Sequence, residues 1–161
     1  MRLIVGIDPG LRGGLAALAP DGAVAGVWPM PVAGGEVHAA GVADLLRSLR
    51  CLDNLQDIGL VCLEKVGAMP KQGVASTFRF GTGWGMVRGV CAALAMPVRL
   101  IPPPVWKKRV LLGYPHDKDG AIRYCTDRWP TVDLIPAGCR VPQDGLAEAL
   151  CLAAYGHQGG G

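Results

Sequence analysis

Short apolar runs bounded by turn residues predict the strands of this chain. The first run, Leu3-Ile4-Val5-Gly6-Ile7, ends at Pro9-Gly10 and predicts a buried central strand followed by a turn. The next two runs are joined to it and to each other by glycine-containing turns, which is typical of an antiparallel meander. The predicted strands are residues 2–8, 13–19, 23–29, 58–64 and 98–101.

Between and after these runs, apolar residues recur with the spacing of helices. The predicted helices are residues 37–49, 74–94, 104–112 and 118–128, and a last helix that begins near Asp144. Gly81, Gly83 and Gly85 predict a break inside the second of them. The order predicts an α/β fold with a five-stranded mixed sheet flanked by helices. Residues 1–158 are expected to form a single domain, and residues 159–161 a frayed glycine tail.

Two of the predicted strands end in an acidic residue. Asp8 ends the first, and Glu64 ends the fourth. The carboxyl ends of strands in such a sheet are where ligands bind, so the two acids can be neighbours there. The alternatives are that Asp8 only caps its turn and that Glu64 pairs with Lys65, although neighbours along a strand point to opposite faces.

Two more acids lie near the start of the last helix. Asp144 and Glu148 are four residues apart and therefore share one helix face. Asp144 could instead be an N-cap, and Glu148 a solvent-facing residue. Glu148, however, is surrounded in the sequence by Ala and Leu, whereas an exposed face carries more charge. This composition favours a functional role for Glu148.

Four carboxylates without a His or Cys cluster suit a hard cation such as Mg²⁺ or Mn²⁺. A pair of such ions about 4 Å apart activates a water and stabilises the leaving oxygen during attack on a phosphate. The sequence therefore predicts a metal-dependent nuclease with Asp8, Glu64, Asp144 and Glu148 as catalytic metal ligands.

Length and composition exclude several other classes. The chain has 161 residues, half of them hydrophobic, which suits about one domain. No apolar run reaches the roughly 18 residues of a membrane span, and the start lacks the signal-peptide pattern, so a cytoplasmic location without a membrane partner is expected. The six cysteines show no Cys-x-x-Cys spacing and are predicted to be reduced core residues.

Positive charge is concentrated in the middle of the chain. Net charge is +3, but residues 65–123 hold ten Lys or Arg and two Asp, a balance of +8, which leaves −5 elsewhere. A basic segment beside an acidic metal site is expected where a phosphate backbone is bound, although such charges also solvate helix faces. The cluster Lys107-Lys108-Arg109 is the leading candidate for backbone contact. Trp106 before it could stack on a base or pack in the core.

Five segments resemble, in order and over nearly the whole chain, the motifs of the RuvC family of Holliday junction resolvases. They are residues 7–14, beginning Ile7-Asp8-Pro9-Gly10, and residues 63–66, 86–89, 104–108 and 144–153. The last segment looks more like the phage-encoded branch. The resemblance implies a ribonuclease H-like fold and a homodimer that cuts two opposing strands of a four-way DNA junction with a divalent metal, in a bacterial cell and with a phage origin.

The resemblance also implies roles for individual residues. Asp8 and Glu64 match the first two catalytic acids of the family. The usual bacterial pattern spaces the last two acids by three residues, whereas Asp144 and Glu148 are four apart, and each can be aligned as the final acid. An aromatic that probes the junction centre is replaced here by residues 67–69, which leaves Met69, Phe78 and Phe80 as substitutes. The predicted DNA contacts are Lys71, Arg79, Lys107, Lys108, Arg109 and Lys118.

Rival functions come from other classes. A sugar-kinase-like or actin-like ATPase also begins with a strand, an acid and a glycine turn, but it needs two related domains, for which this chain is too short. A non-catalytic nucleic-acid-binding module explains the basic segment and leaves the acids unexplained. The same fold also hosts nucleases that act on ribosomal RNA, flaps or branched DNA in general, so the substrate is less determined than the reaction.

Overall fold

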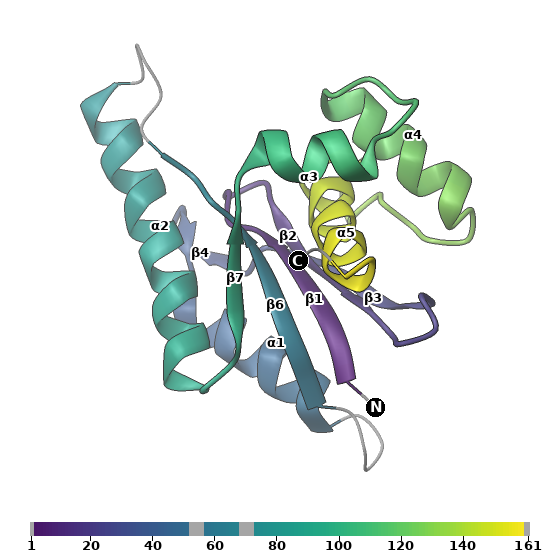
Figure 1. Ribbon diagram of the computed structural model, residues 1–161. Helices are drawn as coiled ribbons and strands as arrows, with labels where there is room; N and C mark the ends of the chain where they lie inside the picture. The colour runs from purple at the N-terminus through teal and green to yellow at the C-terminus, as the bar shows by residue number, and fades with distance from the viewer. Residues whose placement is uncertain (1, 52–56, 68–72, 160–161) are drawn as a thin grey trace.

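A central mixed sheet organises the chain. The structure is a computed structural model that describes residues 2–51, 57–67 and 73–159. The strand order is β3-β2-β1-β6-β7 (Figure 1). β2 runs antiparallel to β1 and β3, whereas β6 runs parallel to β1 and β7. The strands are β1 (Arg2–Asp8), β2 (Gly14–Leu18), β3 (Val24–Pro29), β6 (Asp57–Glu64) and β7 (Val98–Ile101), which confirms the predicted five-stranded mixed sheet.

A small hairpin that was not predicted from the sequence follows β3. It consists of β4 (Val32–Ala33) and β5 (Glu36–Val37), joined by Gly34 and Gly35, whose φ angles are 60° and 77°. Two successive residues with positive φ form the kind of turn that closes a two-residue hairpin loop. Val37 pairs with Val32 and its side chain is buried, so the first helix begins at Ala39 rather than at residue 37.

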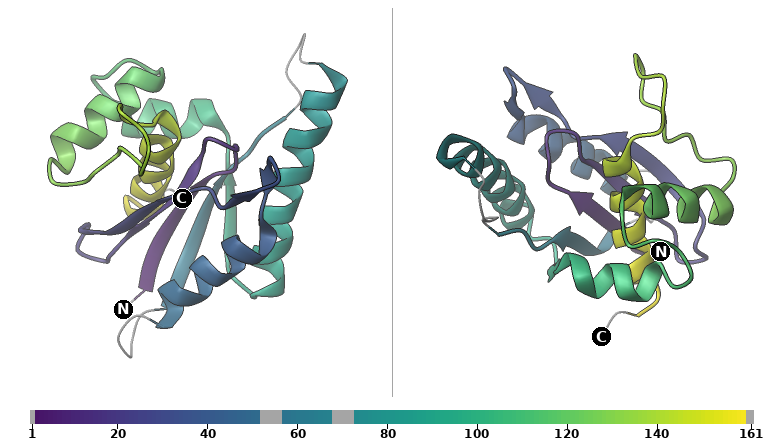
Figure 2. Two further views of the ribbon diagram at one scale, coloured as in Figure 1. Left: turned by 180° about the vertical axis from the view of Figure 1, so that it is seen from behind. Right: turned by 90° about the horizontal axis from the view of Figure 1, so that it is seen from above.

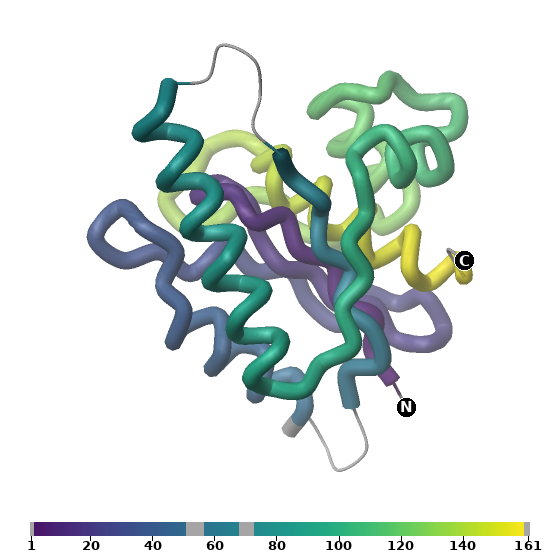
Figure 3. Tube along the Cα trace, turned by 60° about the vertical axis from the view of Figure 1, so that its left-hand side comes forward, coloured from purple at the N-terminus to yellow at the C-terminus, as the bar shows by residue number. Residues whose placement is uncertain are grey.

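Helices cover both faces of the sheet and form a three-layer arrangement (Figure 2). α1 and α2 pack on one face, where they share a core with Leu3, Val5 and Ile7 of β1. α3, α4 and α5 pack on the other face (Figure 3). The helices are α1 (Ala39–Cys51), α2 (Val74–Ala93), α3 (Pro103–Val110), α4 (Lys118–Arg128) and α5 (Asp144–His157).

The predicted break in α2 is wrong, because the helix is continuous through its glycines. Glycine disfavours a helix by about 1 kcal/mol relative to alanine, but it keeps its backbone hydrogen-bonding groups. Gly83 has a packing reason: a Cβ there would lie 2.9 Å from Cγ2 of Val37. The absence of a side chain at Gly83 lets α2 approach β5.

α5 lies directly on the central strand. A Cβ at Gly6 of β1 would lie 2.0 Å from the carbonyl oxygen of Ala149 and 2.4 Å from the nitrogen of Ala153. From Gly145 to Tyr155 the helix is buried at every position except Glu148, as expected for a helix that is apolar all round. The close contact fixes α5 against the sheet and places its first turns beside the end of β1.

Two further features bear on the predicted class of protein. Among the helices that the structure describes, none is long and apolar enough to cross a membrane. Four cysteines, at positions 62, 91, 125 and 151, are buried free thiols as predicted, whereas Cys139 is exposed. The side chain of Cys51 and residues 160–161 of the glycine tail lie outside the described part of the chain.

Candidate active site

The alternation of side chains along β1 and β6 points Asp8 and Glu64 to the same face. Ile7 and Leu63 are paired across the two parallel strands, and both belong to the core shared with α1 and α2. Neighbouring residues of a strand point to opposite faces, so Asp8 and Glu64, each one residue further along, face α5. The two carboxylates therefore sit side by side at the carboxyl ends of adjacent strands.

α5 brings the other two acids to the same edge. A Cβ at Gly145 would lie 2.1 Å from the carbonyl oxygen of Arg12, so the start of α5 touches the turn between β1 and β2. Asp144 lies in the first turn of α5, and Glu148 lies one turn later on the same face. Their side chains are 24% and 13% exposed, respectively. The Asp144 side chain does not cap the helix, since the N-cap position is occupied by Gln143.

The acids interact electrostatically. Burial raises the pKa of Asp8 to about 7. A hydrogen bond of 3.1 Å from the Gly10 backbone N–H lowers this pKa, and the negative charges of Glu64, Glu148 and Asp144 raise it further. Ionising Asp8 in the folded protein is therefore costly without a positive charge nearby. A cluster with this property is a candidate functional site.

Two tryptophans hold Glu64, and neither was predicted from the sequence to contact it. Trp106 is fully buried, and its Nε1–H donates to the Glu64 carboxylate at 3.0 Å. Trp84 donates to the backbone carbonyl of Glu64 at 3.0 Å. Burial raises the pKa of Glu64, and the Trp106 hydrogen bond opposes that rise. Trp106 thus packs in the core, and its ring is not available to stack on a base. The only sequence-level signal for its contact with Glu64 is that a buried indole N–H needs a hydrogen-bond acceptor.

Two of the predicted DNA-binding lysines are ion-paired with the acids of α5. Lys107 Nζ lies 3.1 Å from Glu148 Oε1, and Lys118 Nζ lies 2.5 Å from Asp144 Oδ2. Burial would raise the pKa of Asp144, but Lys118 outweighs this effect and the pKa is lowered. Both lysines therefore lie within reach of a phosphate bound at the acids.

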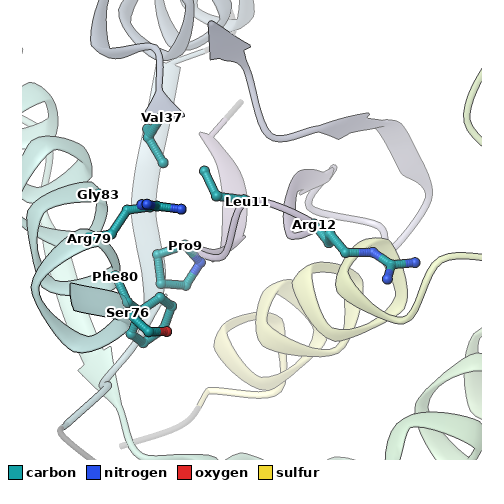
Figure 4. A pocket seen from close by; sticks show the side chains of 8 residues that line it. All are labelled: Pro9, Leu11, Arg12, Val37, Ser76, Arg79, Phe80 and Gly83. Carbon is teal, nitrogen blue, oxygen red and sulfur yellow. The ribbon is translucent and has the colours of Figure 1, made fainter. Parts of the chain in front are cut away.

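The other predicted DNA contacts are spread more widely. Lys108 is exposed on α3. Arg109 projects from α3 to the C-terminal end of α5, where it donates to the Gln158 carbonyl at 2.8 Å and lies over the Tyr155 ring. Arg79 lines a pocket beside α2 (Figure 4). Lys71, together with the junction-probing candidate Met69, lies outside the described residues.

The candidate junction probes on α2 differ in exposure. Phe78 is 76% exposed, whereas Phe80 is partly buried and lines the same pocket as Arg79. The two side chains therefore face different surroundings, although they are only two residues apart.

The acid cluster fits a hard divalent cation in its donor chemistry. In the described ranges no group of three or more His, Cys, Asp or Glu side chains is arranged to hold a metal as it stands. Lys107 and Lys118 each occupy an oxygen of one acid. Four mutually repelling carboxylates on three elements nevertheless form an oxygen-only donor set, which suits Mg²⁺ or Mn²⁺ once the lysines yield those oxygens.

Solved structures of known proteins resemble this fold, whereas the two other comparisons found no match. No protein-family model and no curated protein matches the chain. The structure is similar to Thermus thermophilus RuvC in complex with a Holliday junction substrate, with a TM-score of 0.66, 19% identity, and coverage of 99% of this chain and 97% of that one. A second Thermus thermophilus RuvC structure gives a TM-score of 0.61, 22% identity, and coverage of 98% and 96%.

A more distant likeness extends the same comparison. The yeast mitochondrial Holliday junction resolvase Ydc2 gives a TM-score of 0.52 and 15% identity, over 96% of this chain and 77% of that one. These likenesses confirm the predicted ribonuclease H-like architecture. The chain therefore has the fold of the RuvC-type Holliday junction resolvases over nearly its whole length.

Proposed function

We propose that this protein is a divalent-metal-dependent DNA endonuclease that resolves four-way junctions by paired phosphodiester hydrolysis. The observation that carries the proposal is the gathering of four carboxylates from β1, β6 and α5, whose burial and mutual repulsion raise the pKa of Asp8 to about 7. The similarity to a RuvC bound to a Holliday junction supports branched DNA as the substrate.

The residues of the cluster have separable tasks. Asp8, Glu64, Asp144 and Glu148 would hold Mg²⁺ or Mn²⁺, and a bound pair of such ions supplies an activated water and stabilises the leaving oxygen in an in-line attack. The Gly10 N–H and the Trp106 indole orient the Asp8 and Glu64 carboxylates.

Lys107 and Lys118 can exchange their carboxylate partners for phosphate oxygens of the bound strand, because charge-assisted hydrogen bonds form with either group. Their position beside the acids draws the backbone toward the cluster. The products are a 5′-phosphate and a 3′-hydroxyl.

Paired cuts need two copies of the site, and α2 offers a surface for a homodimer. Gly81, Gly85 and Gly89 recur every four residues on an exposed face of α2, and a Cβ at each would meet nothing within 4 Å. Three such glycines weaken an isolated helix by about 1 kcal/mol each, and no contact within the described residues accounts for them. Small side chains permit a second helix to approach closely, which supports α2 of a second copy as the partner.

The dimer is tested by analytical ultracentrifugation. Gly85→Leu is expected to convert a dimer to a monomer because the added side chain separates the helices. Thr126→Leu, at an exposed position of α4, is the matched control and leaves the dimer intact. A wild-type protein that is monomeric at micromolar concentration would contradict the dimer.

The reaction is tested with labelled four-way junctions, flaps, duplex DNA and RNA in Mg²⁺ or Mn²⁺. Symmetric nicks in the junction are expected, and Asp8→Asn and Glu64→Gln are expected to abolish cleavage while binding is retained. Asp44→Asn, at an exposed position of α1, is the control that keeps activity. Wild-type cleavage by Asp8→Asn or Glu64→Gln would refute the assignment of that acid.

The same assay separates the alternative functions. Cleavage of flaps or RNA at the rate of the junction indicates a broader nuclease of this fold. Binding without cleavage in either metal indicates a non-catalytic nucleic-acid-binding module.

A further inference from the structure

A groove beside the β1–β2 turn borders the acid cluster. It has a volume of about 290 Å³ and lies between that turn, the end of β3 and the segment that precedes α5. Gly13 lines this groove, and a Cβ at Gly13 would lie 2.9 Å from Cγ of Asp8. Gln143 also lines it and directly precedes Asp144 in the chain. This space, named here the turn groove, therefore adjoins two of the four acids.

Arg12 supplies the positive charge of the turn groove. Its side chain is exposed and points away from α2 and toward α5 (Figure 4). Burial and Lys118 have larger effects on the pKa of Asp144, but the charge of Arg12 also lowers that pKa. Arg12 likewise opposes the rise that Asp144 causes in the pKa of Lys118. The guanidinium therefore lies close to the ion pair of Lys118 and Asp144.

Arg12 differs from the two lysines of the site in having no carboxylate partner. Lys107 and Lys118 are ion-paired with the acids of α5, whereas Arg12 makes no ion pair or hydrogen bond within the described part of the chain. The described residues that line the turn groove include no acid. The guanidinium is therefore open to an external anion, and its planar set of donors matches two oxygens of one phosphate.

The rest of the turn groove suits a sugar–phosphate backbone. The side chain of Gln143 makes no capping hydrogen bond to α5, so its amide group is a second donor that faces the groove. Leu146, Pro136 and Pro29 add apolar surface against which the carbons of a deoxyribose can pack. The groove thus combines one cation, one amide and an apolar floor.

We propose that the turn groove holds a phosphate that flanks the cut, with Arg12 as its bidentate ligand and Gln143 as a second donor. In the proposed reaction the scissile phosphate lies at the acids. Because the turn groove adjoins Asp8 and Asp144, successive phosphates of one strand can occupy the two places. Since this site deepens the proposed nuclease function, it rests on that function.

A flanking phosphate contact determines which bond is cut. Contacts to phosphates fix the register of a strand and read no base. A misplacement of about 1 Å at the reacting atoms can lower a rate about 100-fold. Arg12→Gln is therefore expected to slow cleavage and to spread the cuts over neighbouring positions, because the strand can slide along the acids.

The test replaces one phosphate at a time by an uncharged methylphosphonate, on either side of the cut in a four-way junction. Binding is measured with Asp8→Asn, which prevents cleavage. One flanking methylphosphonate is expected to weaken binding about 10- to 150-fold, the range that corresponds to about 1.5–3 kcal/mol for a hydrogen bond to a charged group. With Arg12→Gln in the same background, that methylphosphonate is expected to change binding by about 2-fold or less, because its partner is already missing.

Matched variants separate the turn groove from general effects of charge. Arg47→Gln removes the same charge from an exposed position of α1, so the methylphosphonate is expected to weaken binding as in the parent. Gln143→Glu keeps the size of the side chain but places a carboxylate in the groove, and it is expected to weaken junction binding. Thermal melting checks that each variant is folded. Calorimetry with Mn²⁺ and the DNA-free protein is expected to show no loss of affinity in Arg12→Gln, because the change removes a positive charge near Asp144.

Several results would overturn the proposal. If the wild-type protein cuts the junction but the methylphosphonate weakens binding equally with and without Arg12, the turn groove does not hold that phosphate and the nuclease function stands. The same conclusion follows if no flanking methylphosphonate weakens binding. If Arg12→Gln lowers the affinity for Mn²⁺, Arg12 acts through the acids and the proposed contact is wrong. If the protein neither binds nor cuts any DNA, both the contact and the nuclease function fail.

Discussion

Replacing Trp106 with Phe removes the indole N–H that donates to the buried Glu64 carboxylate at 3.0 Å. A hydrogen bond to a charged group contributes about 1.5–3 kcal/mol, and one pKa unit corresponds to about 1.4 kcal/mol. The Trp106 bond stabilises the ionised carboxylate, so its loss is expected to raise the pKa of Glu64 further. The acidic limb of the pH–rate profile for junction cleavage should therefore move to higher pH.

The same change has a pH-dependent effect on stability. The pKa of folded Glu64 already lies above its ordinary value of 4.5, because burial disfavours the charge. A further rise makes the folded state less stable once the pH exceeds the unfolded pKa, whereas below it Glu64 is protonated in both states. Chemical denaturation without metal should therefore show a larger loss for Trp106→Phe at pH 8 than at pH 4.

Trp84→Phe is the matched control for this prediction. Its indole donates to the backbone carbonyl of Glu64, also at 3.0 Å, and this neutral bond contributes about 0.5–1.5 kcal/mol at either pH. The control is expected to lose stability equally at both pH values and to keep the acidic limb in place. Equal pH dependence in the two variants would refute the role assigned to Trp106.

Three more predictions follow from the site and its packing. Because burial raises the pKa of Asp8 to about 7, its charge destabilises the metal-free fold as the pH rises from about 4 through 7. Asp8→Asn should therefore stabilise the fold by on the order of 2–4 kcal/mol at pH 8 and by little below pH 4. Chemical denaturation in the presence of a chelator measures this difference. Lys118→Met frees a carboxylate oxygen of Asp144, so calorimetry should show tighter binding of Mn²⁺ to the DNA-free protein. Lys108→Met is the control. Unchanged Mn²⁺ affinity in Lys118→Met would contradict a competition between Lys118 and the metal for Asp144. Gly6→Ala forces α5 away from β1 and should destabilise the folded protein by about 1–3 kcal/mol or more, measured by thermal melting. Gly67→Ala is the control and should have little effect, because a Cβ there meets nothing within 4 Å. If Gly6→Ala leaves the stability unchanged, the two elements can separate freely.

Local patterns in the sequence predicted many of the helices and strands. The apolar run ending at Asp8 and the run ending at Glu64 predicted two buried strands whose acids meet at one edge, because alternation and strand ends are properties of a few consecutive residues. The Ala- and Leu-rich surroundings of Glu148 likewise argued against a solvent-facing position, and its side chain is 13% exposed. The break predicted at the α2 glycines was wrong for a related reason. The low helix propensity of glycine is a local property, whereas Gly83 allows a close approach to Val37, which belongs to another element.

What the sequence by itself determined is therefore the set of elements and the carboxylates at their ends. Only the tertiary structure decided how these side chains are held: Trp106 reaches Glu64 across 42 residues, and Lys118 reaches Asp144 from a different helix. The spacing of Asp144 and Glu148 left open which of them aligns with the final acid of the family pattern, and α5, which rests on Gly6, brings both close enough to Asp8 to raise its pKa. Such pairings depend on strand register and on how closely helices approach the sheet, and these are set by the packing of the whole core rather than by any one segment.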